Sequence, residues 1–152
     1  MAKVTFTGKD TVKINGRLFN DLADSPSSLT FPNELVSVKI GKNGNSIYAF
    51  NESGRQCDML LKLIRGSDDD RYLNTQLVLM KADFTSFAML TGEVSRRTTE
   101  KTSDDAVGIT REDIYILSGG VFFKEVEIGA TDDVAVANWR IRFTSAPRAI
   151  TS

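Results

Sequence analysis

Apolar side chains recur at every second position in several short segments of this chain. In residues 55–65, one set of alternate positions holds Cys57, Met59, Leu61 and Leu63. Successive side chains of a β-strand point to opposite faces, so this pattern predicts a strand with one buried face. Because this alternation of apolar and polar side chains recurs in several segments, it predicts a fold built mainly from β-strands.

Turn signals separate the predicted strands. Asn15 and Gly16 lie between apolar residues and favour a tight hairpin, because both tolerate a positive φ. Together, period and turn signals predict strands over 29–40, 46–50, 55–65, 84–94, 112–117, 121–128 and 134–143, with turns at 41–45, 51–54, 119–120 and 129–133. Polar stretches without a period predict long loops over 20–28 and 95–110.

One segment has a helical period instead. Over about 71–82 the apolar positions fall on one broad arc of a helix, and Ser67 or Asp68 can cap its start. The length of 152 residues is typical of one domain. We therefore expect a single domain over 1–152, an antiparallel β-sandwich or barrel with one flanking α-helix and long loops.

The composition excludes most catalytic chemistry. The chain contains no histidine, so the usual neutral-pH base and the usual metal ligand are both missing. Its carboxylate clusters fall in predicted helix starts, loops or turns, and no phosphate-binding glycine motif occurs. We expect no catalytic residue, no metal and no cofactor, and conclude that the protein is not an enzyme.

The segment 137–143, ANWRIRF, combines the only tryptophan with two arginines. Aromatic and cationic side chains can together bind single-stranded nucleic acid, but they must then share a surface. Strand alternation separates them: Trp139, Ile141 and Phe143 share one face, while Asn138, Arg140 and Arg142 share the other. With 19 basic against 20 acidic residues, the chain also lacks a global basic field. The pattern favours an amphipathic strand.

Two stretches resemble the tail tube proteins of contractile-tailed bacteriophages. They are residues 29–74, from LTFPNEL to DDDRYLN, and residues 115–127, YILSGGVFFKEVE, paired with APRAI near the end. The resemblance implies a subunit that closes side by side into hexameric rings, which stack into a hollow conduit for genome delivery. It also implies a sheath protein outside the tube and a baseplate or terminator at its ends, with DNA passing through the lumen without specific binding.

A lumen that passes DNA should be acidic or neutral, because a basic wall would hold phosphates. Strand alternation within this reading suggests Asp58, Glu125 and Glu127 as lumen-facing side chains, unless they pair with Arg140 or Arg142 on adjacent strands. Candidates for contacts between subunits or rings are Lys42, Asn43, Arg96, Arg97, Lys101, Arg140 and Arg142.

The sequence is also compatible with other functions. The chain could be a β-barrel binding module, with arginines that contact single-stranded nucleic acid, or another virion tail component such as a terminator. No signal peptide and no membrane-spanning segment is expected, and the single Cys57 fits a reducing compartment. The expected location is the virion tail, after assembly in the host cytoplasm.

Overall fold

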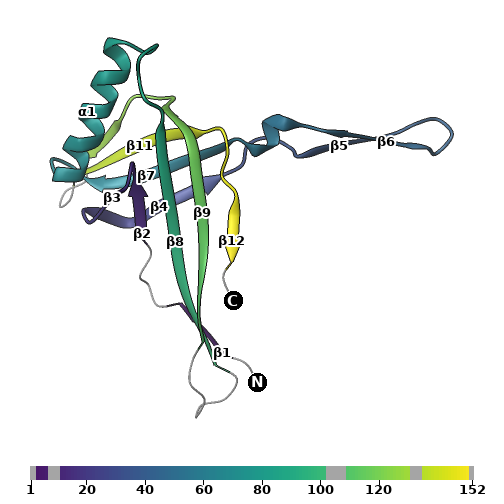
Figure 1. Ribbon diagram of the computed structural model, residues 1–152, viewed down its shortest axis with the longest axis horizontal. Coiled ribbons are helices and arrows are strands. Elements are labelled where there is room, and N and C mark those ends of the chain that lie inside the picture. The colour runs from purple at the N-terminus through teal and green to yellow at the C-terminus, as the bar shows by residue number, and fades with distance from the viewer. Residues whose placement is uncertain (1–2, 7–10, 102–108, 131–134, 151–152) are drawn as a thin grey trace.

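The computed structural model describes residues 3–6, 11–101, 109–130 and 135–150 (Figure 1). These residues form antiparallel strands, one α-helix, α1 (Asp68–Ala82), and one 3-10 helix, η1 (Glu52–Arg55). The strands are β1 (Lys3–Phe6), β2 (Thr11–Ile14), β3 (Arg17–Leu18), β4 (Leu22–Thr30), β5 (Val36–Ile40), β6 (Ser46–Phe50), β7 (Cys57–Ile64), β8 (Leu90–Lys101), β9 (Ile109–Phe122), β10 (Glu127–Ala130), β11 (Ala135–Phe143) and β12 (Arg148–Ile150). The prediction of a mainly β fold with one helix is confirmed.

Most strands join into one bent sheet, in the order β3-β2-β8-β9-β11-β7-β4. Strand β9 connects its two halves: most of β9 pairs with β8, whereas Val121 and Phe122 at its end pair with β11. In Figure 1 the strands β8 and β9 cross β7 and β11 steeply, so the two halves can face each other. Among the described residues, β3 and β4 remain the two ends of this order. The sheet is therefore open and does not close into a barrel.

The core lies between the two halves of the sheet and beneath α1. The predicted inward residues of β7 stand opposite those of β11, in the pairs Cys57–Phe143, Met59–Ile141, Leu61–Trp139 and Leu63–Ala137. All eight side chains are buried, which confirms both predicted strand faces. The other half of the sheet contributes Val12, Ile14, Leu90 and Leu117, and the helix contributes Leu73 and Leu77. Each large apolar side chain buried in this way contributes about 1.5–3 kcal/mol.

The helix begins at Asp68, slightly earlier than predicted, because Ser67 caps it. The Ser67 hydroxyl accepts a hydrogen bond from the Asp70 amide at 3.3 Å. The Asp70 carboxylate also accepts a hydrogen bond from the Trp139 indole nitrogen at 2.9 Å. This bond satisfies the polar atom of a buried tryptophan and fixes the start of α1 against β11.

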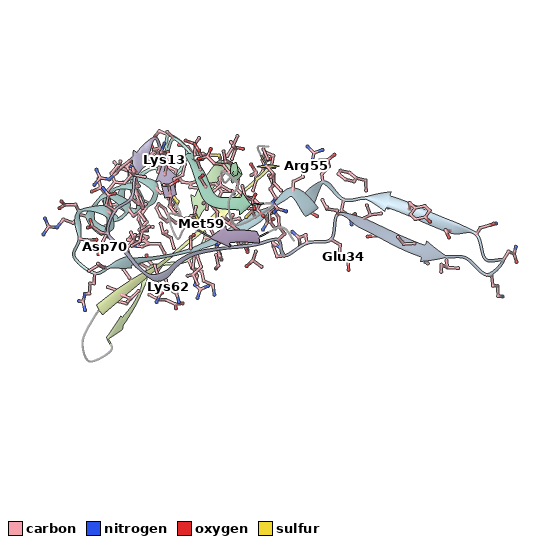
Figure 2. The ribbon with its side chains drawn as sticks, turned by 90° about the horizontal axis from the view of Figure 1, so that it is seen from below. Lys13, Glu34, Arg55, Met59, Lys62 and Asp70 are labelled. Atoms are coloured by element: carbon pink, nitrogen blue, oxygen red, sulfur yellow. The ribbon has the colours of Figure 1, made fainter. Side chains whose placement is uncertain are left out.

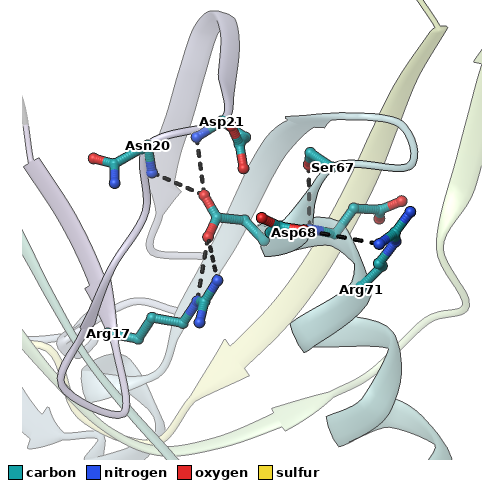
Figure 3. Close-up of polar contacts among 8 residues, drawn as sticks. Arg17, Asn20, Asp21, Ser67, Asp68 and Arg71 are labelled. Atoms are coloured by element: carbon teal, nitrogen blue, oxygen red, sulfur yellow. Dashed lines mark hydrogen bonds and ion pairs between the residues drawn. The ribbon is translucent and has the colours of Figure 1, made fainter.

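A buried carboxylate ties the same helix start to the first hairpin. Asp69 accepts hydrogen bonds from the backbone amides of Asn20 and Asp21 at 2.8 and 2.9 Å. Two guanidinium nitrogens of Arg17 donate to its other oxygen, each at 3.2 Å. Figure 3 shows these bonds converging on one carboxylate between Arg17, Asn20 and Asp21. Two of the three aspartates at 68–70, Asp69 and Asp70, are therefore part of the scaffold.

The hairpin predicted at Asn15 and Gly16 is confirmed. Both residues have a positive φ, 54° and 78°, and they connect β2 to β3. The turn predicted at 41–45 is confirmed as well, and it connects β5 to β6. These turns follow from local chemistry, because glycine and asparagine adopt positive φ at little cost.

The segment 20–28, predicted as a loop, is largely strand β4. Its register with β7 shifts between Leu22 and Ser27, on either side of Pro26. Proline has no N–H to donate, but β4 ends the strand order and needs only one neighbour. An edge position and a bulge therefore accommodate a sequence that looks like a loop.

The long loop predicted over 95–110 is also largely strand. Strand β8 extends to Lys101 and pairs with β9 through Thr98 and Thr99 among others. Threonine favours extended backbone, and the ladder satisfies the backbone polar groups of a polar segment. Residues 102–108 of the predicted loop lie outside the described residues.

The glycine pair at 119–120 does not form the predicted turn. Gly120 pairs with Leu90, so β9 continues to Phe122 before the chain leaves the sheet. The strand predicted over 121–128 is consequently broken, and pairing resumes only at Glu127 in β10.

Two further predicted boundaries need adjustment. Residues 84–89 of the strand predicted over 84–94 precede β8, which begins at Leu90. Gly129 and Ala130 of the turn predicted at 129–133 belong to β10, and 131–134 lie outside the described residues.

The hairpin of β5 and β6 projects from the body of the molecule (Figure 1). Its side chains extend on both sides of the ribbon (Figure 2). It forms a separate two-stranded sheet that pairs with no other described strand. No helix in the described part of the chain is long and apolar enough to cross a membrane.

Candidate assembly interface

The projecting hairpin has one strongly apolar face. The strands pair Val36 with Phe50, Val38 with Tyr48, and Ile40 with Ser46. Directly opposed residues of an antiparallel pair share a face, so five large apolar side chains lie together. We call this surface the hairpin face; it consists of Val36, Val38, Ile40, Tyr48 and Phe50.

The opposite side of the hairpin is more polar. It carries the pairs Ser37–Ala49 and Lys39–Ile47. The hairpin is thus amphipathic, a pattern that belongs to a sheet with one covered face.

Nothing in the described chain covers the hairpin face. Its five side chains keep between 44% and 71% of their surface exposed to solvent. An isolated two-stranded hairpin is only marginally stable in water, and a contiguous exposed apolar patch marks an interaction site. The hairpin face is therefore a candidate for contact with another molecule.

The base of the hairpin is held by several hydrogen bonds. The Asn51 amide donates to the Leu35 carbonyl at 2.7 Å, and the Asn51 side chain donates to the Ser37 hydroxyl at 2.8 Å. Asn33 donates to the Ser53 carbonyl at 3.1 Å. These bonds connect the two strands of the arm to each other and to η1, and so fix the direction of the projection.

The chain crosses itself closely at Gly54. A side-chain carbon at this position would lie 2.7 Å from the Leu35 Cα and 2.8 Å from the Glu34 carbonyl oxygen. Only glycine allows these backbones to approach so closely. A hollow of about 340 Å³ next to this crossing is lined by Phe31, Leu35, Gly54, Arg55, Ser145, Ala146 and Pro147.

A second surface, on the outer side of β7 and β11, carries paired charges. Arg142 donates two hydrogen bonds to Asp58, at 2.8 and 3.1 Å, and its guanidinium lies 4.3 Å from the centre of the Phe123 ring. The hydrogen bond from Arg142 lowers the pKa of Asp58. Arg140 contacts Glu127 at 3.8 Å on the same face. We call Asp58, Glu127, Arg140 and Arg142 the paired-charge face.

The sequence assigned these four residues to different surfaces. It placed Asp58 and Glu127 toward a lumen, and Arg140 and Arg142 at subunit contacts. The structure brings all four onto one face, because β10, β11 and β7 are neighbours in the sheet. The sequence left open the alternative that these carboxylates pair with Arg140 or Arg142. The structure shows this for two of them: Asp58 pairs with Arg142, and Glu127 with Arg140.

Glu125 lies apart from this face. It follows the end of β9, in the break before β10, and forms an ion pair with Lys81 near the end of α1. The strand alternation that grouped Glu125 with Glu127 therefore does not hold.

The other residues predicted to contact neighbouring subunits or rings lie at the tip of the hairpin and on strand β8. Lys42 and Asn43 are exposed at the tip of the hairpin. Strand β8, which the sequence treated as a loop, places Arg96 opposite Asp113, Arg97 opposite Glu112, and Lys101 opposite Lys3. Asp113 is bound by Arg148 through two hydrogen bonds, at 2.8 and 2.7 Å.

Sequence reasoning did not identify the hairpin face as an interface. The alternation of Val36, Val38 and Ile40 was visible, and these residues do form strand β5. The single strand predicted over 29–40 is nevertheless broken, because β4 ends at Thr30 and residues 31–35 belong to no strand. Alternation cannot distinguish a face covered by the chain itself from one that meets another molecule. Within the described residues, no three carboxylate or cysteine side chains are grouped so that they could hold a metal ion.

No protein-family model and no curated protein matches this sequence. Among solved structures, the chain is similar to a chain in the "Cryo-EM structure of the anti-feeding prophage (AFP) baseplate, 6-fold symmetrised". The two chains are 13% identical, with a TM-score of 0.45, and the match covers 92% of this chain and 90% of that chain. Identity and TM-score are both low, so the function proposed below rests on the geometry and sequence of this chain.

Proposed function

We propose that this protein is a structural subunit of a phage-tail-like tube. Copies of the chain join side by side into hexameric rings, and the rings stack into a hollow conduit for genome delivery. The observation that carries the proposal is the uncovered hairpin face, because a subunit of an assembly needs an apolar surface that its own chain does not bury. The sequence resemblance of residues 29–74 and 115–127 to tail tube proteins supports the same assignment.

The open sheet fits the same role. Among the described residues, strand β4 ends the strand order and pairs with β7 alone. Free edges favour pairing with another chain, and closure around a ring removes them. A neighbour that extends the sheet would also contribute to a continuous wall.

The paired-charge face suits a surface past which DNA moves. Arg142 is bound by Asp58, and Arg140 contacts Glu127, so carboxylates compensate the charge of both arginines. Compensated arginines hold phosphates less strongly than free ones. The same ion pairs argue against a binding module that would use Arg140 and Arg142 to hold single-stranded nucleic acid.

In this proposal the protein has no enzymatic role. Its partners are other copies of itself, a sheath outside and a baseplate or terminator at the tube ends. It assembles in the host cytoplasm into the virion tail.

Electron microscopy of the purified full chain tests the proposal, both alone and in the presence of the tail baseplate that would nucleate a tube. We expect rings or hollow tubes from the wild type, and loss of these particles in the variant Val38→Asp, which places a charge in the hairpin face. The matched control is Ala49→Asp, on the opposite side of the same hairpin. Monomers under both wild-type conditions, or unimpaired assembly of Val38→Asp, would refute the proposal.

A further inference from the structure

The hairpin face needs a specific acceptor if the proposed function is correct, and the following inference rests on that function. Ring closure joins two different surfaces of the same subunit, in a head-to-tail contact. Two hairpin faces packed against each other would instead make a closed dimer. The acceptor must therefore be a second apolar surface elsewhere on the chain.

Candidates for such a surface are four exposed apolar side chains on the last turns of α1 and in the segment that connects it to β8. Val78 and Leu79 on the last turns of the helix, Phe84 just after it, and Met89 before β8 are 54% to 60% exposed. We call these four side chains the helix-end patch. Met80 and Phe87, within the same segment, pack against the core and hold the patch in place.

The turn beneath the patch is preorganised. Asp83 accepts hydrogen bonds from the amide and hydroxyl of Thr85, at 3.2 and 2.7 Å, and from the hydroxyl of Ser86. These bonds lower the pKa of Asp83, chiefly the hydrogen bond from the Ser86 hydroxyl. The carboxylate is negative at neutral pH, as an exposed aspartate ordinarily is. Lys81 is already paired with Glu125, which leaves Asp83 to set the charge of the patch.

The arm that carries the hairpin face is positively charged as a whole. Residues 35–51 contain no acidic residue, and their two lysines are Lys42 at the tip and Lys39 on the side opposite the hairpin face. The helix-end patch presents the carboxylate of Asp83 beside Phe84. A positive arm and a negative acceptor attract each other, and this attraction favours one orientation of the contact.

The two surfaces lie at opposite ends of the molecule. Figure 1 shows α1 at one end of the long axis and the hairpin at the other, so a subunit cannot cover its own patch. The hairpin of a neighbouring subunit can cover it. We propose that the hairpin face of each subunit packs on the helix-end patch of the next copy of this chain.

Disulfide trapping in assembled particles tests this contact. The variant Y48C/L79C places one thiol in the hairpin face and one in the helix-end patch. Cys57 does not interfere, because it is fully buried and burial raises the pKa of its thiol to about 11. The matched control, A49C/L79C, moves the first thiol to the other side of the hairpin.

After mild oxidation we expect a ladder of covalent oligomers from Y48C/L79C on a non-reducing gel, with loss of the ladder on reduction. The control should remain largely monomeric on the same gel. Microscopy of each sample before oxidation shows whether rings are present. Rings without the ladder, or an equal ladder from the control, would overturn the acceptor assignment and leave the tube proposal intact. Absence of rings in the wild type as well would overturn both.

A charge variant provides a second measurement. V78D/L79D introduces two carboxylates into the helix-end patch, and N74D/T75D introduces two on exposed positions of the same helix outside it. We expect both variants to stay folded, with a somewhat lower thermal midpoint for V78D/L79D, because two carboxylates then lie near the negative end of the helix dipole. Only V78D/L79D should lose assembly. Rings formed by V78D/L79D would contradict the proposed contact.

Discussion

The guanidinium of Arg17, on strand β3, donates two hydrogen bonds of 3.2 Å to the carboxylate of Asp69, in the first turn of α1. The other oxygen of Asp69 accepts from two backbone amides, so a nearly buried charge is fully compensated. A carboxylate in such surroundings is costly to remove, because each partner then loses its acceptor.

We expect Asp69→Ala to lower the free energy of unfolding by about 2–4 kcal/mol, because the amides of Asn20 and Asp21 and the guanidinium of Arg17 lose their acceptor. Asp68→Ala is the matched control. The Asp68 side chain is 83% exposed and forms only a surface ion pair with Arg71, 3.8 Å long. Its loss should cost less than about 1 kcal/mol. Urea denaturation measures both, and equal losses would contradict the structural role of Asp69.

The ion pair of Asp58 and Arg142 should make the stability of the folded chain depend on pH. The pKa of Asp58 lies below its ordinary value of 3.8 in the folded chain, chiefly because Arg142 donates to the carboxylate. The contribution of Asp58 to the free energy of unfolding is therefore complete above its ordinary pKa. It is lost as the pH falls through the lower pKa that Asp58 has in the folded chain.

Wild type should then be more stable than Asp58→Asn at neutral pH, and the difference should shrink as the pH falls from about 5 to about 2. Thermal midpoints of both proteins across this range measure the effect. A difference that stays constant with pH would show that the charge of Asp58 makes no contribution.

The crossing at Gly54 should not tolerate a side chain. Gly54→Ala would place a carbon 2.7 Å from the Leu35 Cα, so the backbone at 34–35 must move. We expect a loss of about 1–3 kcal/mol, typical of overpacking, and impaired assembly because the hairpin changes direction. Gly41→Ala is the control, since its nearest contact is 3.4 Å. Thermal unfolding and microscopy compare the two, and identical behaviour would exclude a special role for Gly54.

Reversal of two acidic side chains tests the lumen hypothesis. E125K/E127K removes the partners of Lys81 and Arg140 and adds positive charge. If these positions line the conduit, tubes should still form, but genome passage should slow because a basic wall retains phosphates. The control is Glu34→Lys, at the base of the hairpin. Infectivity is measured for particles that carry each variant. Unchanged infectivity of E125K/E127K would contradict the assignment of both residues to the lumen.

Several features could be predicted from short stretches of sequence. Trp139, Ile141 and Phe143 were predicted to face the core together, and all three are buried. The turn at Asn15 and Gly16 follows from two residues that accept a positive φ. The helix follows from its period, and Ser67, one of two residues predicted as possible caps, caps it.

Other features depend on strands that lie far apart in the chain. The contact between Arg17 and Asp69 and the pairing of Asp58 with Arg142 both need a sheet order that no local pattern specifies. The polar residues around Pro26 and Thr98 form strands because neighbouring strands offer hydrogen bonds to them. Propensity alone favours a loop in both cases, and pairing overrides it.

The sequence by itself determined the periods: which residues alternate, where a helix replaces a strand, and where the tight hairpin turns at 15–16 and 41–45 lie. Those properties depend on side chains only a few positions apart. Only the tertiary structure decided that the alternating apolar residues of β7 and β11 face each other in a core, whereas those of β5 and β6 face solvent on a projecting arm. The physical reason is that a pattern specifies that a face should be covered, while the surface that covers it depends on which segments the fold brings together.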